Sequence, residues 1–272
     1  MITLFHGSSA EIRKPLALAG RQNLDFGRGF YLTADRAQAL SRALRPMNAR
    51  KTGFLSKWEL DFDAVKSGWR VKVFEAYDEE WLDFVMACRK GSSVWERYGA
   101  VQGGTVDDSV FVTMELYTAG LLDRDEALSR LAGEKPSVQI CIHEQEIIER
   151  CLHLTETSSI SVGSEPQESP VPNPTLMQMK YSRVIWLLSK ALQIGIPDAL
   201  DVFYRSETYM NISEPRNHLH NMGDLCLVDE IILELQRGQG ACIGRRRSGA
   251  GPSHEASPIR CCCRMAGALK KR

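Results

Sequence analysis

The spacing of apolar residues predicts helices in the C-terminal part of the chain. Between residues 177 and 192, apolar side chains recur every three or four positions and share one helical face: Tyr181, Ile185, Leu188 and Leu192. A second helix is expected to begin at Pro197, and a third covers residues 225–235. Residues 177–236 are therefore expected to form a small unit of three or four helices.

Residues 1–155 carry a different pattern, in which short β-favouring runs are interspersed with helical ones. Strands are expected at residues 2–5, 29–33, 54–62, 69–74 and 138–142, and helices at residues 36–44, 79–89, 109–119 and 124–131. These elements follow no regular βαβ period, and no G-x-G-x-x-G motif follows the first strand. We therefore expect an α+β fold and not a Rossmann domain.

Two changes in composition divide the chain into four parts. Residues 156–176 are rich in proline and serine, which is typical of a linker. From residue 237 onward the hydrophobic periodicity is lost, and we expect disorder there. The expected organisation is a mixed domain (1–155), a linker (156–176), a small helical domain (177–236) and a basic tail (237–272).

The charge is distributed unevenly although the chain is neutral overall, with 34 Lys and Arg against 34 Asp and Glu in 272 residues. The tail from Arg237 holds nine basic residues and one acidic residue, which leaves residues 1–236 with a net charge of −8. A duplex nucleic-acid clamp needs a basic face, so the acidic body argues against one, and the tail alone is weak support.

The chain has no apolar run long enough to span a membrane and opens without a signal-like leader. Four of its eight cysteines lie in the tail, and the other four lie in apolar-patterned segments: Cys88, Cys141, Cys151 and Cys226. This distribution fits a reducing compartment, so we expect a cytoplasmic protein that does not bind membranes.

Candidate ligand-binding residues cluster at the start of the chain. His6, Gly7 and Ser8 end the first strand and offer a ring with donor and acceptor nitrogens, a close backbone approach and a hydroxyl. These three residues also fit an ordinary strand-to-loop junction. Arg28 could meet a diphosphate through its forked donors, or could be a solvated surface residue.

Two adjacent aromatic residues follow on the second expected strand. Phe30 and Tyr31 must point to opposite faces, so one is expected in the core, and the other can line a cleft and stack on a flat heterocycle. Taken alone, the pair is better explained as two core aromatic residues.

Three other patterns are better explained by structure than by catalysis. The run from His143 has Ile147 where a zinc-protease motif needs its second histidine. His218 and His220 are two residues apart, which favours packing or capping over a metal site. Asp107 or Asp108 is placed to cap the helix that follows.

Four blocks of the sequence, in order, resemble an uncharacterised bacterial family assigned to the ADP-ribosyltransferase superfamily. The blocks are LFHGSSAEIRKP, DFGRGFYLTADRAQAL, YGAVQGGTVDDSVF and SVQICIHEQEIIERCLHL, and together they cover about residues 1–155. Residues 177–236, which end in YMNISEPRNHLHNMGDLCLVDEIILELQ, resemble a small helical domain of unknown function. The resemblance implies a split antiparallel sheet with NAD bound, as substrate, across the cleft between its halves.

The resemblance also implies roles for individual residues. His6 matches the residue that bonds the NAD ribose, and the Gly7 backbone would meet the nicotinamide amide. Tyr31 matches the aromatic residue that stacks on nicotinamide, with Phe30 beside it. Gln139 stands where the superfamily usually has a glutamate that contacts the ribose 2′-hydroxyl and stabilises the charge at the anomeric carbon.

Gln139 departs from the superfamily's pattern, and the departure affects the expected activity. An amide keeps the hydrogen bond of a carboxylate but loses its Coulombic stabilisation of an oxocarbenium-like transition state. Another acid could substitute, and the candidates are Asp25, Asp108, Glu144 and Glu146.

The function that this resemblance implies is transfer of ADP-ribose to an unknown macromolecular acceptor with release of nicotinamide, as in a toxin or effector. The alternative is a catalytically impaired NAD-binding or protein-interaction module. In either case residues 177–236 could contact a partner or restrain the first domain.

Overall fold

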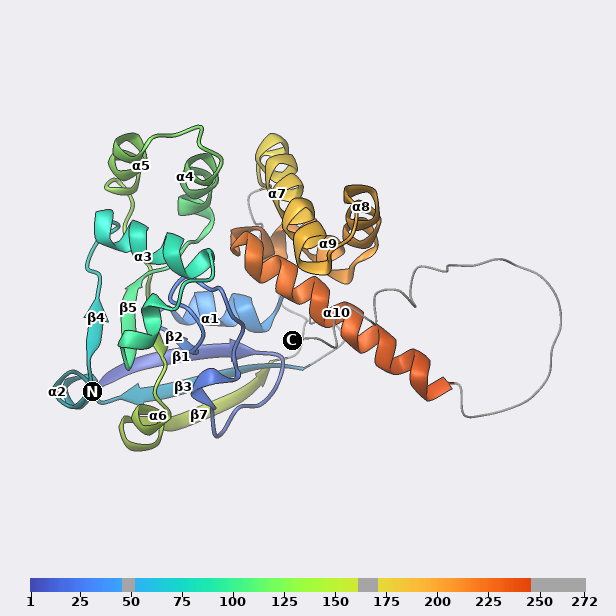
Figure 1. The fold of residues 1–272 in the computed structure, drawn as a ribbon. Helices are drawn as coiled ribbons and strands as arrows, with labels where there is room; N and C mark the ends of the chain where they lie inside the picture. The colour runs from blue at the N-terminus through green and yellow to red at the C-terminus, as the bar shows by residue number, and fades with distance from the viewer. Residues whose placement is uncertain (46–51, 161–170, 246–272) are drawn as a thin grey trace.

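The chain folds as an α+β protein built on one seven-stranded sheet (Figure 1). The structure is a computed structural model that describes residues 1–45, 52–160 and 171–245, with side chains up to residue 237. The strands are β1 (Ile2–Ser8), β2 (Phe30–Thr33), β3 (Gly53–Leu60), β4 (Val71–Val73), β5 (Ala100–Gly104), β6 (Val138–Ile142) and β7 (Leu152–Ile160).

The sheet has the strand order β4-β5-β6-β2-β1-β3-β7. Every neighbouring pair is antiparallel except β4 and β5, which are parallel, so the expected antiparallel sheet is in fact mixed. β1 pairs with β3 along its whole length, from Ile2 with Leu60 to Ser8 with Phe54. In contrast, β1 and β2 share a single register pair, Phe5 with Thr33. The sheet is therefore weakly joined at its centre.

The described part of residues 1–155 contains six α-helices: α1 (Arg36–Ala43), α2 (Phe62–Gly68), α3 (Glu79–Arg89), α4 (Asp108–Thr118), α5 (Arg124–Leu131) and α6 (Gln145–Cys151). Aspartate caps fix the starts of five of them, because their carboxylates accept backbone N–H groups of the first turn. The capping residues are Asp35, Asp61, Asp78, Asp107 and Asp123. The prediction of a cap at Asp107 is confirmed.

The predicted elements agree with the structure where the sequence has a strong period or a cap. The helices at 79–89 and 124–131 and the strand at 138–142 have the predicted bounds. β5, β7, α2 and α6 were not predicted. β5 ends in two glycines, which disfavour a strand in isolation, and its pairing with β6 supplies the stabilisation that its sequence lacks.

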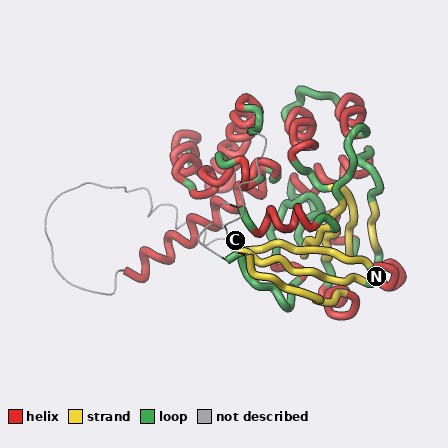
Figure 2. The backbone as a smooth tube through the Cα atoms, turned by 180° about the vertical axis from the view of Figure 1, so that it is seen from behind, coloured by secondary structure: helices red, strands yellow, loops and turns green. Residues whose placement is uncertain are grey.

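The C-terminal helices are α7 (Pro174–Leu192), α8 (Ile196–Arg205), α9 (Glu207–Ile212) and α10 (Asp224–Arg245). They share a core that includes Val184, Leu188, Phe203 and Ile231. Figure 1 shows α7 next to α4, and Figure 2 shows the C-terminal helices from behind, on one side of the strands.

The expected linker and tail are both shorter in the structure than the sequence suggested. β7 continues to Ile160 by pairing with β3, and Asn173 caps α7 ahead of Pro174, so neither end of 156–176 is a linker. α10 continues to Arg245, beyond the expected end at residue 235. Residues 161–170 and 246–272 lie outside the described residues, and the disorder expected for the tail stays a prediction there.

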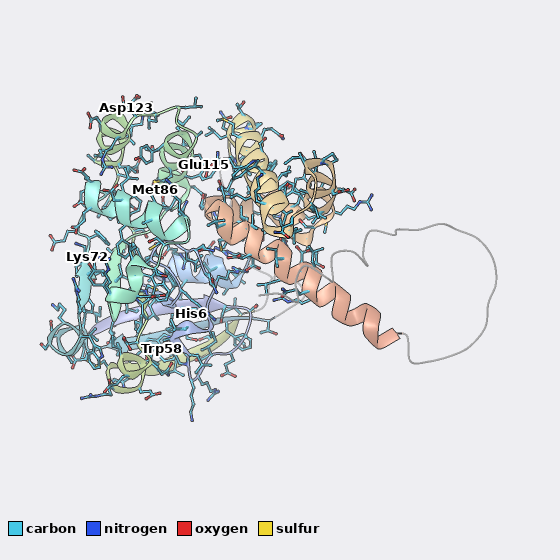
Figure 3. The ribbon with its side chains drawn as sticks, in the orientation of Figure 1. His6, Trp58, Lys72, Met86, Glu115 and Asp123 are labelled. Atoms are coloured by element: carbon cyan, nitrogen blue, oxygen red, sulfur yellow. The ribbon has the colours of Figure 1, made fainter. Side chains whose placement is uncertain are left out.

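A buried ionic cluster fixes α7 and α10 to α4. Lys180 Nζ donates to Glu115 Oε1 (2.8 Å) and to Asp224 Oδ1 (3.2 Å), while Arg183 donates to the same two carboxylates. Lys180 is 1 % exposed and Glu115, on α4 (Figure 3), is 3 % exposed. Burial alone would raise the pKa of Asp224, but Lys180 and Arg183 hold that pKa below its usual value. The cluster satisfies its own charges.

No helix in the described part of the chain is long and apolar enough to cross a membrane.

We predict that Glu115→Ala destabilises the protein by about 3 kcal/mol or more, because it leaves the buried Lys180 ammonium with an incomplete set of acceptors. Urea unfolding of the full chain measures the change. Glu126→Ala is the control, since Glu126 pairs with Arg130 on the exposed surface of α5 and should cost less than about 1 kcal/mol. Equal losses in the two variants would contradict the role given to the cluster.

Candidate functional site

A cavity of about 1270 Å³ lies beside the weak junction between β1 and β2, near the middle of the strand order. Beyond the single pair of Phe5 with Thr33, the two strands share no further register pair, and His6 and Tyr31 both line the cavity. The side chain of His6 bridges the gap, since its Nδ1 lies 2.8 Å from the carbonyl oxygen of Tyr31. This side-chain hydrogen bond takes the place of further backbone hydrogen bonds between β1 and β2.

The bond to Tyr31 defines the chemistry of His6. A carbonyl oxygen only accepts, so Nδ1 carries the proton and Nε2 is left as an acceptor. Burial lowers the pKa of His6 to about 4, against a rise from the bond to Tyr31, and the nearby Arg42 lowers it further. His6 is therefore neutral at pH 7 and can accept a hydrogen bond from a ligand hydroxyl.

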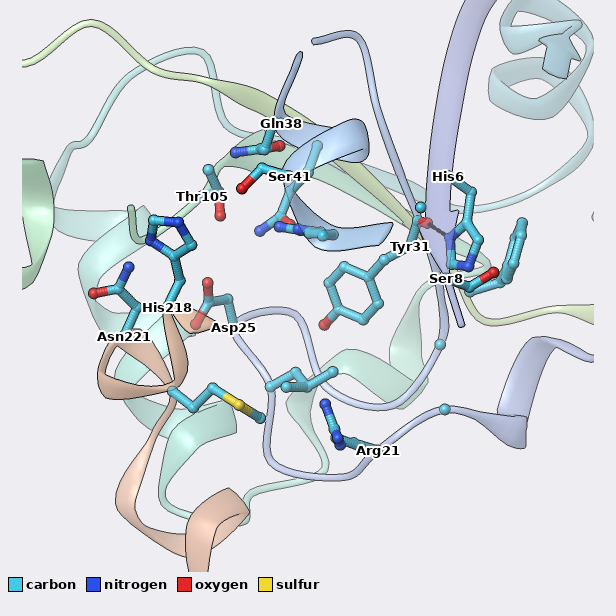
Figure 4. A pocket seen from close by; sticks show the side chains of 18 of the residues that line it. His6, Ser8, Arg21, Asp25, Tyr31, Gln38, Ser41, Thr105, His218 and Asn221 are labelled. Atoms are coloured by element: carbon cyan, nitrogen blue, oxygen red, sulfur yellow. Dashed lines mark hydrogen bonds between the residues drawn. The ribbon is translucent and has the colours of Figure 1, made fainter. Parts of the chain in front are cut away.

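The two adjacent aromatic residues of β2 point to opposite faces, as the strand period requires. Phe30 is 6 % exposed and packs on the His6 ring, with centroids 4.7 Å apart. Tyr31 points into the cavity between His6 and Asp25 (Figure 4). Its hydroxyl donates to the carbonyl of Gly27 (2.7 Å) and accepts from the backbone N–H of Phe26 (3.1 Å). These bonds hold the Tyr31 ring in place as part of the cavity wall.

Gln139 lies on β6, between Thr33 of β2 and Gly103 of β5. It also lines the cavity, although the residue is only 2 % exposed. Its Nε2 is buried and makes no hydrogen bond to any residue that the structure describes. A buried amide donor with no partner costs about 1 to 3 kcal/mol, so Gln139 is suited to donate to a ligand.

Of the remaining residues predicted from the sequence to bind a ligand, some line the cavity and one does not. Gly7 and Ser8 line the cavity, and the hydroxyl of Ser8 donates to the carbonyl of Ala10 (2.6 Å). Arg28 is not among the lining residues, because its guanidinium folds back to donate to the carbonyl of Gly20 (3.1 Å). Of the predicted ligand-binding residues, Arg28 alone is not brought to the cavity.

Among the described residues, four carboxylates line the cavity, and protein donors engage each of them: Asp25, Asp35, Asp107 and Asp108. Asp35 and Asp107 cap helices. Asp25 pairs with Arg89 at 2.7 Å. The other two candidate substitutes for the missing glutamate, Glu144 and Glu146, are not among the residues that line the cavity.

Asp108 is bonded to residues of the C-terminal part of the chain. It accepts from Asn221 (2.6 Å) and lies 3.1 Å from His220 Nε2 and 3.2 Å from His218 Nδ1. Burial would raise the pKa of Asp108, but these hydrogen bonds hold it far below its usual value. His220 is 1 % exposed and packs edge-on against Phe111, so the packing prediction for this residue is confirmed.

The segment between α9 and α10 also completes the cavity wall through His218 and residues 221–223 (Figure 4). Arg89 Nη2 donates to the carbonyl of Asn221 (2.6 Å) while pairing with Asp25. Arg21 of the first region pairs with Glu230 of α10 at 2.5 Å. These contacts join residues more than 100 positions apart in Arg21–Glu230 and Arg89–Asn221, so no local pattern in the sequence could predict them.

Sequence reasoning also missed the side of the cavity formed by α1. Gln38, Ser41 and Arg42 of α1 line it at helical spacings of three and four, together with Arg45 just beyond the end of the helix. The spacing was a usable signal, but it does not show which face of the helix meets a ligand. Within the described residues, no group of three or more His, Cys, Asp or Glu side chains could hold a metal ion.

The fold and site define an α+β protein with a large cavity at the centre of its sheet, lined by a neutral histidine, a fixed tyrosine and several arginines. A family model described as a protein of unknown function, DUF3990, matches residues 2–154, and the chain belongs to that family. Comparisons with curated proteins and with solved structures find no match.

We predict that His6 makes the stability of the protein pH-dependent. Its pKa is depressed in the folded state, so its contribution is fully present above pH 6.5 and is lost as the pH falls toward 4. Between pH 7 and pH 5, the wild type should lose about 2 kcal/mol relative to His6→Asn, at about 1.4 kcal/mol per unit. Urea unfolding at both pH values measures this difference, and parallel losses in the two proteins would contradict it.

Proposed function

We propose that residues 1–155 have an ADP-ribosyltransferase-like fold that binds NAD, transfers ADP-ribose to a macromolecular acceptor and releases nicotinamide. The observation that carries this proposal is the convergence of His6, Tyr31 and Gln139 on one cavity. They come from three strands of the sheet and are far apart in the sequence. Their order also matches the superfamily that the sequence resembles.

Each of the three residues has a chemical property that suits its proposed role. Neutral His6 offers Nε2 as an acceptor for a ribose hydroxyl. The Tyr31 ring, fixed by its hydroxyl, offers a surface on which nicotinamide can stack. The buried Nε2 of Gln139 can donate to the ribose 2′-oxygen. A cavity of about 1270 Å³ is large enough for a dinucleotide.

In the proposed reaction, the bond between the anomeric carbon and the nicotinamide nitrogen breaks, and the electron pair leaves with nicotinamide. A nucleophile of the acceptor forms the new bond to that carbon and loses its proton. Positive charge develops on the ribose in the transition state, where an adjacent carboxylate would be stabilising.

A second function is favoured by a specific observation, namely the state of the acids in the cavity. Gln139 is neutral, and all four lining carboxylates are bonded to protein donors. None of them is poised to replace the glutamate that the superfamily usually has. The alternative is therefore a catalytically impaired module that binds NAD or a protein partner without releasing nicotinamide.

We predict that the purified full chain releases nicotinamide from NAD, faster in the presence of cell lysate as a source of acceptor. His6→Ala and Tyr31→Ala should abolish release, because each removes one ligand contact. Gln139→Glu should raise it by about 10²- to 10³-fold, since an electrostatic group of this kind lowers the barrier by about 2.7 to 4 kcal/mol. Chromatographic measurement of free nicotinamide gives all three results.

His153→Ala is the matched control, because His153 is an exposed residue of β7 that does not line the cavity. Release by Gln139→Glu but not by the wild type would favour the impaired module. If NAD neither binds nor reacts with the stable wild type, and Tyr31→Ala behaves identically, the proposal is wrong.

A further inference from the structure

Helix α1 turns one polar face toward the cavity. Gln38, Ser41 and Arg42 lie within four residues of one another on one side of the helix, and Arg45, two residues beyond its end, lines the same cavity. Gln38 and Ser41 are seen above Tyr31 in Figure 4. The opposite side of α1 carries Ala39 and Ala43, both fully buried.

The position of this face is fixed by Gly7. A Cβ on Gly7 would lie 1.7 Å from the carbonyl oxygen of Ala39, so only glycine lets α1 rest directly on β1. Gly7 and His6 are neighbours on β1, so this packing holds α1 beside His6. The contact between Gly7 and Ala39 therefore fixes where the backbone around Arg42 and Arg45 lies.

Arg42 of α1 and Arg45, just beyond its end, differ from the other arginines of the cavity in their partners. Arg21 pairs with Glu230, and Arg89 pairs with Asp25. Neither Arg42 nor Arg45 forms an ion pair with any acidic residue in the described ranges. Arg45 Nε is buried, and it has no hydrogen-bond partner among those residues.

The electrostatics of this wall show positive charge that the protein compensates only in part. Burial lowers the pKa of Arg45 to about 9, and Arg42 and Arg21 lower it further. Burial also lowers the pKa of Arg42, although Asp25 and Tyr31 act against this. Because arginines withdrawn from solvent are usually paired, two half-buried arginines that line one cavity and form no ion pair within the described residues indicate a site for an anion.

We propose that Arg42 and Arg45 bind the diphosphate group of a dinucleotide ligand. This inference rests on the proposed function, in which the nicotinamide stacks on Tyr31 and its ribose bonds to His6. Arg42 lowers the pKa of His6, and both residues line the cavity. A diphosphate that follows a ribose bonded to His6 is therefore placed beside Arg42. The planar fork of each guanidinium matches phosphate oxygens and can bond them bidentately.

The enclosure of the site favours a small ligand over a nucleic-acid backbone. The arginines line a cavity, and residues 1–236 carry a net charge of −8, which disfavours a long polyanion. A diphosphate of a single small molecule reaches both arginines without crossing the acidic surface.

The test measures the affinity of the full chain for ADP-ribose, inorganic pyrophosphate and adenosine by titration calorimetry. We expect ADP-ribose to bind the wild type and to bind about 10- to 100-fold more weakly to Arg42→Gln and Arg45→Gln, the range for losing a charge-assisted hydrogen bond. Pyrophosphate should compete with ADP-ribose, whereas adenosine, which has no phosphate, should bind the wild type and both variants with the same affinity.

Arg36→Gln is the matched control, because Arg36 lies on the same helix but is exposed and outside the cavity. It should bind ADP-ribose as the wild type does. If the glutamine variants do not fold by circular dichroism, Arg42→Lys and Arg45→Lys keep the charge and should weaken binding through loss of the fork alone. Equal affinity in all folded variants, or no binding of either diphosphate to the wild type, overturns the inference.

The inference and the proposed function fail in different ways. Arginine-dependent binding of ADP-ribose and pyrophosphate without nicotinamide release supports the diphosphate site and counts against the transferase. Conversely, nicotinamide release that needs Tyr31 but is unchanged in Arg42→Gln and Arg45→Gln supports the transferase and overturns the diphosphate site.

Discussion

The close contact between Gly7 and the backbone of Ala39 is the constraint on which the rest of the site depends. Because Gly7 has no side chain, α1 lies directly against β1, which in turn pairs with β3 along its whole length. β1 is thus held by a helix on one face and by a strand along one edge. Its other edge meets β2 at one register pair only, so the opening in the sheet lies beside a strand that is itself well fixed.

At that opening, backbone groups of β1 and β2 lack partners on the neighbouring strand, and nearby side chains supply hydrogen bonds in their place. His6 donates to the carbonyl of Tyr31, and the hydroxyl of Tyr31 bonds twice to the loop at residues 26–27. The same bonds make His6 a neutral acceptor and immobilise the Tyr31 ring. His6 and Tyr31 therefore both stabilise the opening and offer groups for ligand binding, because a polar group that is fixed and shielded from water serves both purposes.

Local signals in the sequence were sufficient for much of the fold but for less of the site. Helix α3 and the cap at Asp107 follow from short-range chemistry and were predicted correctly. β5 depends on pairing with a distant strand, and the folding back of Arg28 onto Gly20 depends on a loop path, so neither could be read locally. The arginines of α1 were missed for a related reason, since a helical period fixes a face but not what that face meets.

The segment between α9 and α10 belongs to the site and not only to the fold. His218 and Asn221 bond Asp108 at the cavity edge, and Asn221 also accepts from Arg89, which neutralises Asp25. This segment therefore supplies hydrogen-bond donors to Asp108, and it helps to position the arginine that pairs with Asp25. A chain without it would have a differently charged cavity with one wall missing. The chemistry of the cavity is consequently a property of the full chain, even though the proposed ligand-binding residues lie in its first 155 residues.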